Sequence, residues 1–564
     1  MYVLGLWDGH DSGAALLRDN QIIYAANEER FTKRKLEVKF PYNSIRAALA
    51  YAKISPEDVE IVAFSTLDFT KTLTRMFPEQ KERYYQFRRR KMLRPNFESL
   101  RHFGKYEMTS IGVLPFCNTI SKSIIASELG KMGFRHYKLY SVDHHTAHAA
   151  TAAFPSGFKR GLIITLDGVG DGLSGSISTL KNGILKGEKS IPARNSLGIF
   201  YEQVTNIVGM RELEDEGKVM AMADYSFPFP FEQNRLRDFF KVSGTEIIAK
   251  HGPITQYEML SRIAWSMPRE QFAYMAQQLA EHVIKGFVNN AIEEFGISDV
   301  ALSGGVFSNV KANMKVKDLK GLRSWFVFPH MGDGGLAMGA AMYANYIANG
   351  ISYYAFENAY FGDSFSEDQI KSALKGQRGI SYERVSSPGK YAGELINKNN
   401  YVFWFQGRAE FGPRALGNRS ILANAGDEQV KEKLNIHVKQ REWYQPFAPA
   451  MLKEDAPRLL EGVKGDSRFM TMTYKVRHDK KEIMKSVIHV DLTARPQILE
   501  NKNVEYESVM KQVKKATGYG VVLNTSFNIH GQPIVTTPQE AIETMKTTKT
   551  RYMFLGNYLV ERKG

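Results

Sequence analysis

Three histidines stand close together in the stretch DHHTAHAATAAF, which begins at Asp143. His144 and His148 are four residues apart, so in a helix their imidazoles lie on one face about one turn from each other, as two metal ligands require. The small residues that follow suit a helix buried against a sheet, and Asp143 can cap its amino end. Histidines that only pack or cap are the alternative interpretation, because a single pair is weak evidence without further ligands.

Two aspartates are the candidates for the remaining ligands. Cys117 is the only cysteine, so a metal ion has to be held by His, Asp or Glu side chains. Asp167 closes the strand-like stretch GLIITLD, and Asp333 follows a second apolar stretch at 323–328. Two histidines and two aspartates that converge at strand ends would form a site suited to Fe(II), Mn(II) or Zn(II) beside a bound nucleotide.

The elements that would position these residues occur twice. Residues 2–17 read YVLGLWDGHDSGAALL, and residues 161–179 read GLIITLDGVGDGLSGSIST. Each segment is an apolar strand, an Asp-Gly turn (Asp8-Gly9 and Asp167-Gly168) and a second strand. The repeat predicts a duplicated α/β fold of two similar lobes, whose glycine turns can approach nucleotide phosphates closely. The turn GGVFSN at 304–309, after the strand-like DVALS, is a third candidate phosphate or nucleoside contact.

Composition limits the class of protein. A chain of 564 residues favours two or three domains, and the formal net charge of +15 indicates polyanionic partners such as nucleotides, phosphorylated substrates or nucleic acid. The start MYVLGLWDGHD has no basic segment typical of a signal peptide, and no apolar run is long enough to span a membrane. The sequence therefore predicts a cytoplasmic protein without a membrane anchor.

Long motifs follow one another over nearly the whole chain: HDSGAALL, EERFTKRK, DHHTAHAATAAF, TLDGVGDG, EGKVMAMADY, SGGVFSN, GDGGLAMGAA, GRAEFGPRALGNRSILA, KQREWYQPFAPAML, DLTARPQ and VLNTSFNIHGQPIV. In these motifs and in their order the chain resembles a known family, the O-carbamoyltransferases of the NodU and TobZ type.

The resemblance implies an α/β protein with two domains. Residues 1–355 would form a duplicated, Kae1-like domain of the actin and sugar-kinase fold, and residues 365–564 an α+β, YrdC-like domain. In the family, the second domain converts carbamoyl phosphate and ATP, bound with Mg(II), into carbamoyl-adenylate. The first domain then passes the carbamoyl group to an acceptor hydroxyl and releases AMP.

The resemblance also assigns residues of the first domain. His144, His148, Asp167 and Asp333 match the metal ligands, and Fe(II) or Mn(II) is the expected ion. His10 matches the residue that helps to deprotonate the acceptor hydroxyl. The positions that match the family's contacts to the nucleotide or the intermediate are Lys35, Glu216, Lys218, Gly304, Gly305 and Asn309.

The second domain carries a cationic set that matches the family's contacts to carbamoyl phosphate and ATP phosphates. Joining two anions requires neutralisation, which arginine forks and lysine charges provide. The matching residues are Arg414 and Lys439, which also match catalytic positions, Arg441 and Arg495, with polar contacts from Asn524, Ser526 and Asn528. Gln445 stands where many relatives have arginine, which puts one phosphate contact in doubt.

The acceptor is not predicted beyond a small molecule or glycan with a free hydroxyl. Its pocket is expected from residues 66–125 and 226–270, the segments that match the shared motifs least. A second copy of the chain is a candidate partner, whereas nucleic acid and membrane are not expected. Two alternatives remain: threonylcarbamoyl modification of tRNA, which the positive charge favours, and a non-catalytic nucleotide-binding regulator.

Overall fold

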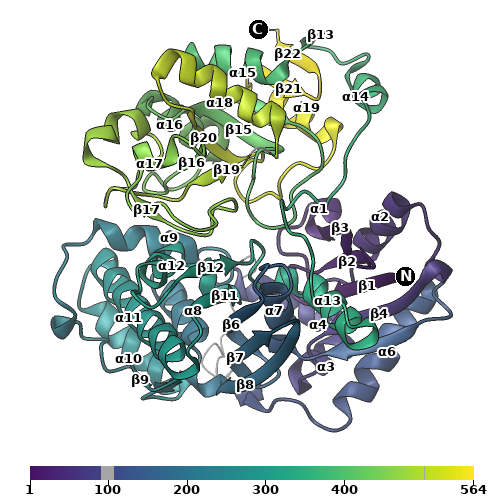
Figure 1. Ribbon diagram of the computed structural model, residues 1–564, viewed down its shortest axis with the longest axis vertical. Helices are drawn as coiled ribbons and strands as arrows, with labels where there is room; N and C mark the ends of the chain where they lie inside the picture. The colour runs from purple at the N-terminus through teal and green to yellow at the C-terminus, as the bar shows by residue number, and fades with distance from the viewer. Residues whose placement is uncertain (91–103, 105–106, 109, 501, 564) are drawn as a thin grey trace. The chain divides into compact units, whose positions relative to one another are not determined.

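The computed structural model describes residues 1–90, 104, 107–108, 110–500 and 502–563. Their contacts divide the chain into two compact units, each of mixed α/β structure (Figure 1). Unit 1 comprises Met1–Glu28 and Leu36–Phe356, and unit 2 comprises Glu29–Lys35 and Glu357–Gly564. The short segment 29–35 thus packs with unit 2 although it lies near the amino terminus. Within the described residues, no helix combines the length and the apolar character needed to cross a membrane.

Unit 1 contains two five-stranded sheets with the same strand order, β3-β2-β1-β4-β5 and β8-β7-β6-β11-β12. In each sheet an antiparallel meander is extended by two parallel strands. The duplication predicted from the two Asp-Gly turns is therefore confirmed in the sheet topology. The strands are β1 (Tyr2–Trp7), β2 (Gly13–Arg18), β3 (Gln21–Asn27), β4 (Val59–Ser65), β5 (Lys138–Val142), β6 (Arg160–Gly170), β7 (Leu173–Lys181), β8 (Ile184–Pro192), β11 (Asp299–Ser303) and β12 (Ser324–Val327).

Two helices rich in small residues lie between the sheets. Helix α7 (His144–Ala153) follows β5 but packs on β6, β7 and β11 of the other sheet, and α13 (Leu336–Asn349) follows β12 but packs on β1, β2 and β4. A Cβ on Gly5 would lie 1.9 Å from the Ala337 carbonyl oxygen, and one on Gly339 would lie 2.1 Å from that of Ala147. Glycine at both positions therefore permits the close packing that brings the two helices and the two sheets together.

Other helices of unit 1 surround its sheets. They include α2 (Tyr42–Ala52), α3 (Phe69–Met76), α4 (Pro78–Arg88), α6 (Cys117–Lys131), α8 (Leu197–Ile207), α9 (Glu216–Met222), α10 (Pro253–Trp265), α11 (Arg269–Phe295) and α12 (Val310–Lys317). Helix α12 begins directly after the glycine turn that follows β11, as the stretch GGVFSN predicts.

Unit 2 is built on an eight-stranded mixed sheet of order β13-β22-β21-β14-β15-β20-β16-β19. Its strands are β13 (Ile380–Arg384), β14 (Val402–Phe405), β15 (Arg419–Asn424), β16 (Ala448–Leu452), β19 (Gln497–Leu499), β20 (Val521–Ser526), β21 (Tyr552–Leu555) and β22 (Tyr558–Arg562). Helices α15 (Pro388–Asn397) and α18 (Val504–Thr517) lie side by side on this sheet (Figure 1). They share a core with Trp404 and Phe554 of the central strands.

Candidate metal centre and candidate anion site

Helix α7 places His144 and His148 on one face, with both Nε2 atoms directed at the same pair of carboxylates. His144 Nε2 lies 3.2 Å from Asp167 Oδ2 and 3.6 Å from Asp333 Oδ1. His148 Nε2 lies 3.6 Å from Asp333 Oδ1 and 4.0 Å from Asp167 Oδ2. The side chain of Asp143 accepts from the Thr146 amide and caps this helix, as the sequence predicts.

The two aspartates come from the second sheet: Asp167 lies in strand β6, and Asp333 lies in the turn that follows strand β12. Asp167 lies in β6 where pairing with β7 is interrupted, between Leu166 and Gly170. Asp333 begins the short turn that leads into α13. One ligand atom from each of the four residues lies within 4.8 Å of all the others. The structure therefore brings together the four residues that the sequence singled out.

The donor set fits a divalent cation. His148 Nε2 is buried and has no hydrogen-bond partner, because 3.6 Å to the nearest carboxylate oxygen is too long for one. The other ring nitrogens are engaged by hydroxyl groups: His144 Nδ1 lies 2.9 Å from Thr66 Oγ1, and His148 Nδ1 lies 3.4 Å from Ser303 Oγ. Imidazole and carboxylate oxygen together suit Fe(II), Mn(II) or Zn(II), and an outer contact on Nδ1 is the usual arrangement around such ligands.

Electrostatics at this site favour positive charge. Burial opposes the charge of His144, but Asp333 and Asp167 outweigh it and raise its pKa to about 10. Burial alone would raise the pKa of Asp167, yet its hydrogen bond with His144 and the neighbouring imidazoles hold the pKa well below its usual range. The two carboxylates therefore favour a cation beside His144.

His145, the third histidine of the helix, points elsewhere. Its Nδ1 lies 2.9 Å from Thr165 Oγ1 in β6, outside the four-residue cluster. Burial, together with the charges of His144 and His148, lowers its pKa to about 3, so the ring stays neutral.

His10 stands beside the cluster. Its Nδ1 lies 3.5 Å from Asp333 Oδ2, and its ring is 5.6 Å from that of Tyr85 in α4. The Trp7 indole donates to the His10 carbonyl oxygen at 2.8 Å and fixes the turn. Burial lowers the pKa of His10 although Asp333 opposes that shift. A neutral imidazole in this position can accept a proton.

The glycine turn after β11 faces the same cluster. Gly304 has a φ of +102°, and a Cβ there would lie 2.1 Å from the Leu166 carbonyl oxygen. The Gly305 amide donates to Asp167 Oδ1 at 2.6 Å. Asn309 caps α12 by accepting from the Ala312 amide and also exchanges hydrogen bonds with Gln277. Gly304 and Gly305 therefore lie next to the candidate metal centre, whereas the Asn309 side chain is engaged in capping.

Glu216 and Lys218 lie at the start of α9. Burial and the nearby Glu202 raise the pKa of Glu216 to about 8, so it is largely protonated at neutral pH. Its Oε1 accepts from the Leu213 amide at 2.7 Å. Lys218 Nζ pairs with Asp215 at 2.9 Å within the same turn. Neither side chain is among the cluster of four ligands.

Lys439 of unit 2 is buried at the end of a single π-helical segment, Leu434–Lys439. Its Nζ donates to Asn528 Oδ1 at 2.8 Å, to Ser526 Oγ at 3.1 Å, to the Asn528 carbonyl at 3.2 Å and to the Ser526 carbonyl. Burial, Arg441 and Lys35 all lower its pKa. The structure thus joins Lys439 to Ser526 and Asn528, and it places the charge of Lys35 near Lys439.

Three arginines complete a cationic cluster. Arg441 lies over the ring of Phe447 at 4.0 Å, and its Nε donates to Asn435 Oδ1 at 2.9 Å. Burial lowers the pKa of Arg495, and Arg414 and Arg441 lower it further, so the three charges lie close together. Among the described residues, no ion pair joins Arg414, Lys439, Arg441 or Arg495 to a carboxylate. Lys439 is buried and the three arginines are half-buried, and four neighbouring cations without a carboxylate partner indicate a site for an anion.

Two amides border this cluster. Asn524 Nδ2 donates to the Ala415 carbonyl at 3.1 Å, while its buried Oδ1 has no hydrogen-bond partner. Gln445 Nε2 is likewise buried without an acceptor, and the Gln445 carbonyl accepts from Arg441. The side chain that stands where many relatives have arginine therefore keeps an unused donor beside Arg441.

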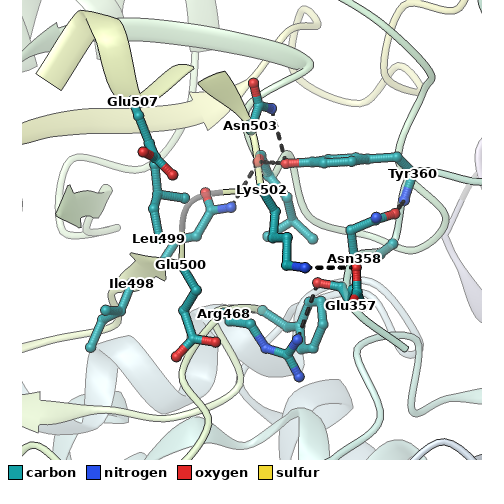
Figure 2. A pocket seen from close by; sticks show the side chains of 14 residues that line it. Glu357, Asn358, Tyr360, Arg468, Ile498, Leu499, Glu500, Lys502, Asn503 and Glu507 are labelled. Atoms are coloured by element: carbon teal, nitrogen blue, oxygen red, sulfur yellow. Dashed lines mark hydrogen bonds and ion pairs between the residues drawn. The ribbon is translucent and has the colours of Figure 1, made fainter. Parts of the chain in front are cut away.

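A separate pocket of unit 2 contains none of the predicted site residues. Figure 2 shows its lining, in which Lys502 pairs with Glu357 at 2.9 Å and the Asn503 amide donates to the Tyr360 hydroxyl at 3.2 Å. Its cavity volume of about 30 Å³ is far below the ~300–1,000 Å³ of ordinary ligand pockets. It has room for a water molecule or two, not for a nucleotide.

Sequence patterns did not identify some residues of unit 1 that contact the centre. Thr66 and Tyr85 belong to the least recognisable segment, of which residues 91–103, 105–106 and 109 lie outside the described residues. Arg88 pairs with Glu202 at 2.6 Å and Glu212 at 2.9 Å near His10. Asp171 could have been found, since it lies in the quoted stretch TLDGVGDG four residues after Asp167.

Two family models match this chain, one in each of its two parts. Residues 2–342 match the family model described as carbamoyltransferase N-terminus, and residues 393–562 match carbamoyltransferase C-terminus. The chain belongs to the carbamoyltransferase family and is a transferase. Nodulation protein NolNO of Sinorhizobium fredii is 31% identical over 98% of this chain and 79% of its own length.

Two further comparisons are more distant. The 3'-hydroxymethylcephem-O-carbamoyltransferase of Streptomyces clavuligerus is 27% identical over 62% of this chain and 65% of its own length. The crystal structure of HypF from T. kodakarensis covers 62% of this chain and 48% of its own, with 15% identity and a TM-score of 0.35.

Proposed function

We propose that the protein is an ATP-dependent O-carbamoyltransferase that works in two partial reactions. Unit 2 would form carbamoyl-adenylate from carbamoyl phosphate and ATP, and unit 1 would transfer the carbamoyl group to an acceptor hydroxyl. In this proposal unit 1 has the duplicated actin and sugar-kinase fold, with its repeated sheet order as support, and unit 2 is YrdC-like.

The observation that carries the proposal is the cluster of Arg414, Lys439, Arg441 and Arg495. Like charges in a buried region repel each other and lose hydration, and both effects depress their pKa values. Carbamoyl phosphate and the triphosphate of ATP are the anions that would relieve this cost. Arginine can hold their oxygens bidentately, and Lys439 adds a point charge fixed by Ser526 and Asn528.

The first partial reaction balances with one water molecule. Water releases phosphate from carbamoyl phosphate and leaves carbamate. A carbamate oxygen then attacks the α-phosphorus of ATP, a new P–O bond forms, and pyrophosphate leaves. The cations of unit 2 would stabilise the negative charge on both leaving groups.

The second partial reaction belongs to the centre in unit 1. The acceptor oxygen attacks the carbamoyl carbon, the bond from that carbon to the adenylate oxygen breaks, and AMP leaves. His10 would accept the hydroxyl proton, and the Gly304-Gly305 turn would lie against the nucleotide. A divalent ion held by His144, His148, Asp167 and Asp333 would supply Lewis-acid stabilisation of the charge that develops.

We propose a small molecule or glycan with a free hydroxyl as the acceptor, the cytoplasm as the location, and a second copy of the chain as a candidate partner. The name of the Streptomyces clavuligerus relative, 3'-hydroxymethylcephem-O-carbamoyltransferase, supports an alcohol as the acceptor class.

The test is incubation of the purified protein with ATP, Mg(II), labelled carbamoyl phosphate and Mn(II) or Fe(II). We expect pyrophosphate release, and label in one member of a panel of amino sugars, oligosaccharides and polyketide alcohols. Label that appears only in total tRNA would replace the proposal with tRNA modification. Absence of both pyrophosphate and AMP under every condition would support a non-catalytic regulator instead.

A further inference from the structure

We propose that Asp171 and Thr66 are positioning residues that fix the orientation of the metal ligand His144 and couple it to helix α3. The inference rests on the proposed metal centre, and concerns two residues that are not among the four candidate ligands.

The Asp171 carboxylate joins three segments of unit 1. Its Oδ1 accepts from the amides of Leu67 and Asp68 at 2.6 and 2.7 Å, and its Oδ2 accepts from the His144 amide at 2.7 Å. In return, the Asp171 amide donates to Asp68 Oδ2 at 3.2 Å. These contacts, named here the Asp171 bridge, connect the β6–β7 turn, the end of β4 and the first residue of α7.

The bridge is specific for a carboxylate. All three of its donors are backbone N–H groups, and the two acceptor oxygens of the Asp171 side chain satisfy them together. An asparagine would have to place its NH₂ group against at least one N–H, because only one of its two terminal atoms is an acceptor. Asp171 is buried, so water cannot replace the lost contact without a rearrangement.

Thr66 contacts the ring of the same histidine. Its Oγ1 lies 2.9 Å from His144 Nδ1, opposite the Nε2 atom that faces Asp167. Coordination of a metal ion through Nε2 requires the ring proton on Nδ1, and the Thr66 hydroxyl oxygen can accept a hydrogen bond from this N–H group. Thr66 has a φ of +72°, which is unfavourable for a β-branched residue and is typically retained where function requires the side chain.

Gly170 completes the enclosure of the ring. A Cβ at this position would lie 2.1 Å from His144 Cγ, so the imidazole lies directly against the glycine backbone. With its amide on Asp171, its Nδ1 on Thr66 and one face on Gly170, His144 has one orientation available. That orientation directs Nε2 at the two carboxylates.

The same residues hold helix α3. Asp68 caps it through the Lys71 amide at 2.7 Å, and Arg75 of α3 donates to the Thr66 carbonyl at 2.7 Å. A shift of α3 would therefore move Thr66 and the Asp171 bridge together. Helix α4, which follows α3, carries the Tyr85 ring that lies beside His10.

The experiment measures metal binding alone, with no ATP, carbamoyl phosphate or acceptor. Mn(II) titration and the absorption spectrum of the Co(II) protein are compared for wild type, Asp171→Asn, Thr66→Val and Thr66→Ser. We expect Mn(II) affinity to fall about 10–100-fold in Asp171→Asn and about 10-fold in Thr66→Val, with an altered Co(II) spectrum in both. Thr66→Ser keeps the hydroxyl and should restore wild-type binding.

Asp455→Asn is the matched control, since Asp455 is a fully buried aspartate of unit 2 that accepts from the Gly520 amide. It should leave Mn(II) affinity unchanged. Wild-type affinity and spectrum in folded Asp171→Asn and Thr66→Val would overturn the inference. If Asp171→Asn does not fold, the contrast between Thr66→Val and Thr66→Ser decides the matter. Failure to find carbamoyl transfer would not affect these titrations, so the two proposals can fail separately.

Discussion

Replacing Lys439 by methionine tests the division of labour between the two units. The change keeps most of the side-chain volume and removes the charge that Ser526 and Asn528 hold in place. The rate of pyrophosphate release from ATP and carbamoyl phosphate should fall strongly, because this cation belongs to the cluster proposed to bind both anions. His144→Ala, by contrast, should abolish only carbamoyl transfer and leave pyrophosphate release intact.

The size of the effect follows from the geometry. A fixed unit charge about 4 Å from a phosphate oxygen interacts by about 4 kcal/mol at an effective dielectric constant of ~20. Removal of one preorganised donor to a developing charge costs about 10²–10³ in rate, which is the same range. Methionine also removes one donor from the acceptors of Ser526 and Asn528, although Asn528 Oδ1 still accepts from Ser526 Oγ and the Ser526 carbonyl from the Asn528 amide, so the free energy of unfolding should fall by about 1 kcal/mol.

The assay separates these two consequences. Initial rates of pyrophosphate release are measured at saturating ATP and carbamoyl phosphate, and urea unfolding is measured on the same preparations. Lys433→Met is the matched control, because Lys433 is exposed on the preceding helix, and it should change neither quantity. A loss of pyrophosphate release below threefold in folded Lys439→Met, or equal loss of both partial reactions in Lys439→Met and His144→Ala, would refute the assignment.

Three further results are expected. Chelation of divalent ions should abolish carbamoyl transfer, and added Mn(II) or Fe(II) should restore it in wild type but not in His148→Ala; restoration in that variant would exclude His148 as a ligand. Asp8 is buried among Arg75, Lys71 and Lys81, and although burial opposes its charge these cations hold its pKa below the ordinary 3.8. Its stabilising contribution is therefore present above pH 4 and lost as the pH falls below it; urea unfolding should show this loss in wild type, whereas Asp8→Asn should be less stable by about 3–5 kcal/mol at pH 7 and lack the loss. Because the pKa of Glu216 is raised from 4.5 to about 8, the protonated side chain favours the folded state below pH 4.5 and this contribution is lost as the pH rises from 4.5 to 8; Glu216→Gln should lose less stability than wild type between pH 5 and pH 8, and identical unfolding curves would contradict the shift.

Local sequence patterns were sufficient to predict several elements of the fold. The strand DVALS and the capped histidine helix occur where the sequence predicts them, since alternation, small residues and an Asp cap act within a few positions. The same holds for the duplicated Asp-Gly turns, which mark equivalent places in two sheets of equal strand order.

Other features depend on which distant segments meet. The placement of 29–35 with unit 2 follows from contacts such as the Arg30 guanidinium with the Gly412 carbonyl at 2.8 Å, a pairing across 382 positions. Thr66 meets His144 only because β4 and β5 are parallel neighbours. Neither contact leaves a periodic signal, so neither could be predicted from one sequence.

The duplication also shows why Asp167 of the second sheet, and not its counterpart Asp8 of the first sheet, is a candidate metal ligand. Asp8 ends β1 as Asp167 lies in β6, so the two carboxylates are topological equivalents. In the first lobe Arg75 donates to both oxygens of Asp8 at 3.0 Å, and Lys71 Nζ lies 2.9 Å away. In the second lobe the neighbours of Asp167 are His144, His148 and the Gly305 amide. Cationic side chains thus neutralise one aspartate permanently, while the other keeps imidazole neighbours that can share a divalent ion. Arg75, which neutralises Asp8 in the first lobe, also donates to the Thr66 carbonyl. The first lobe thus holds in place Thr66, the residue proposed to orient the metal ligand His144.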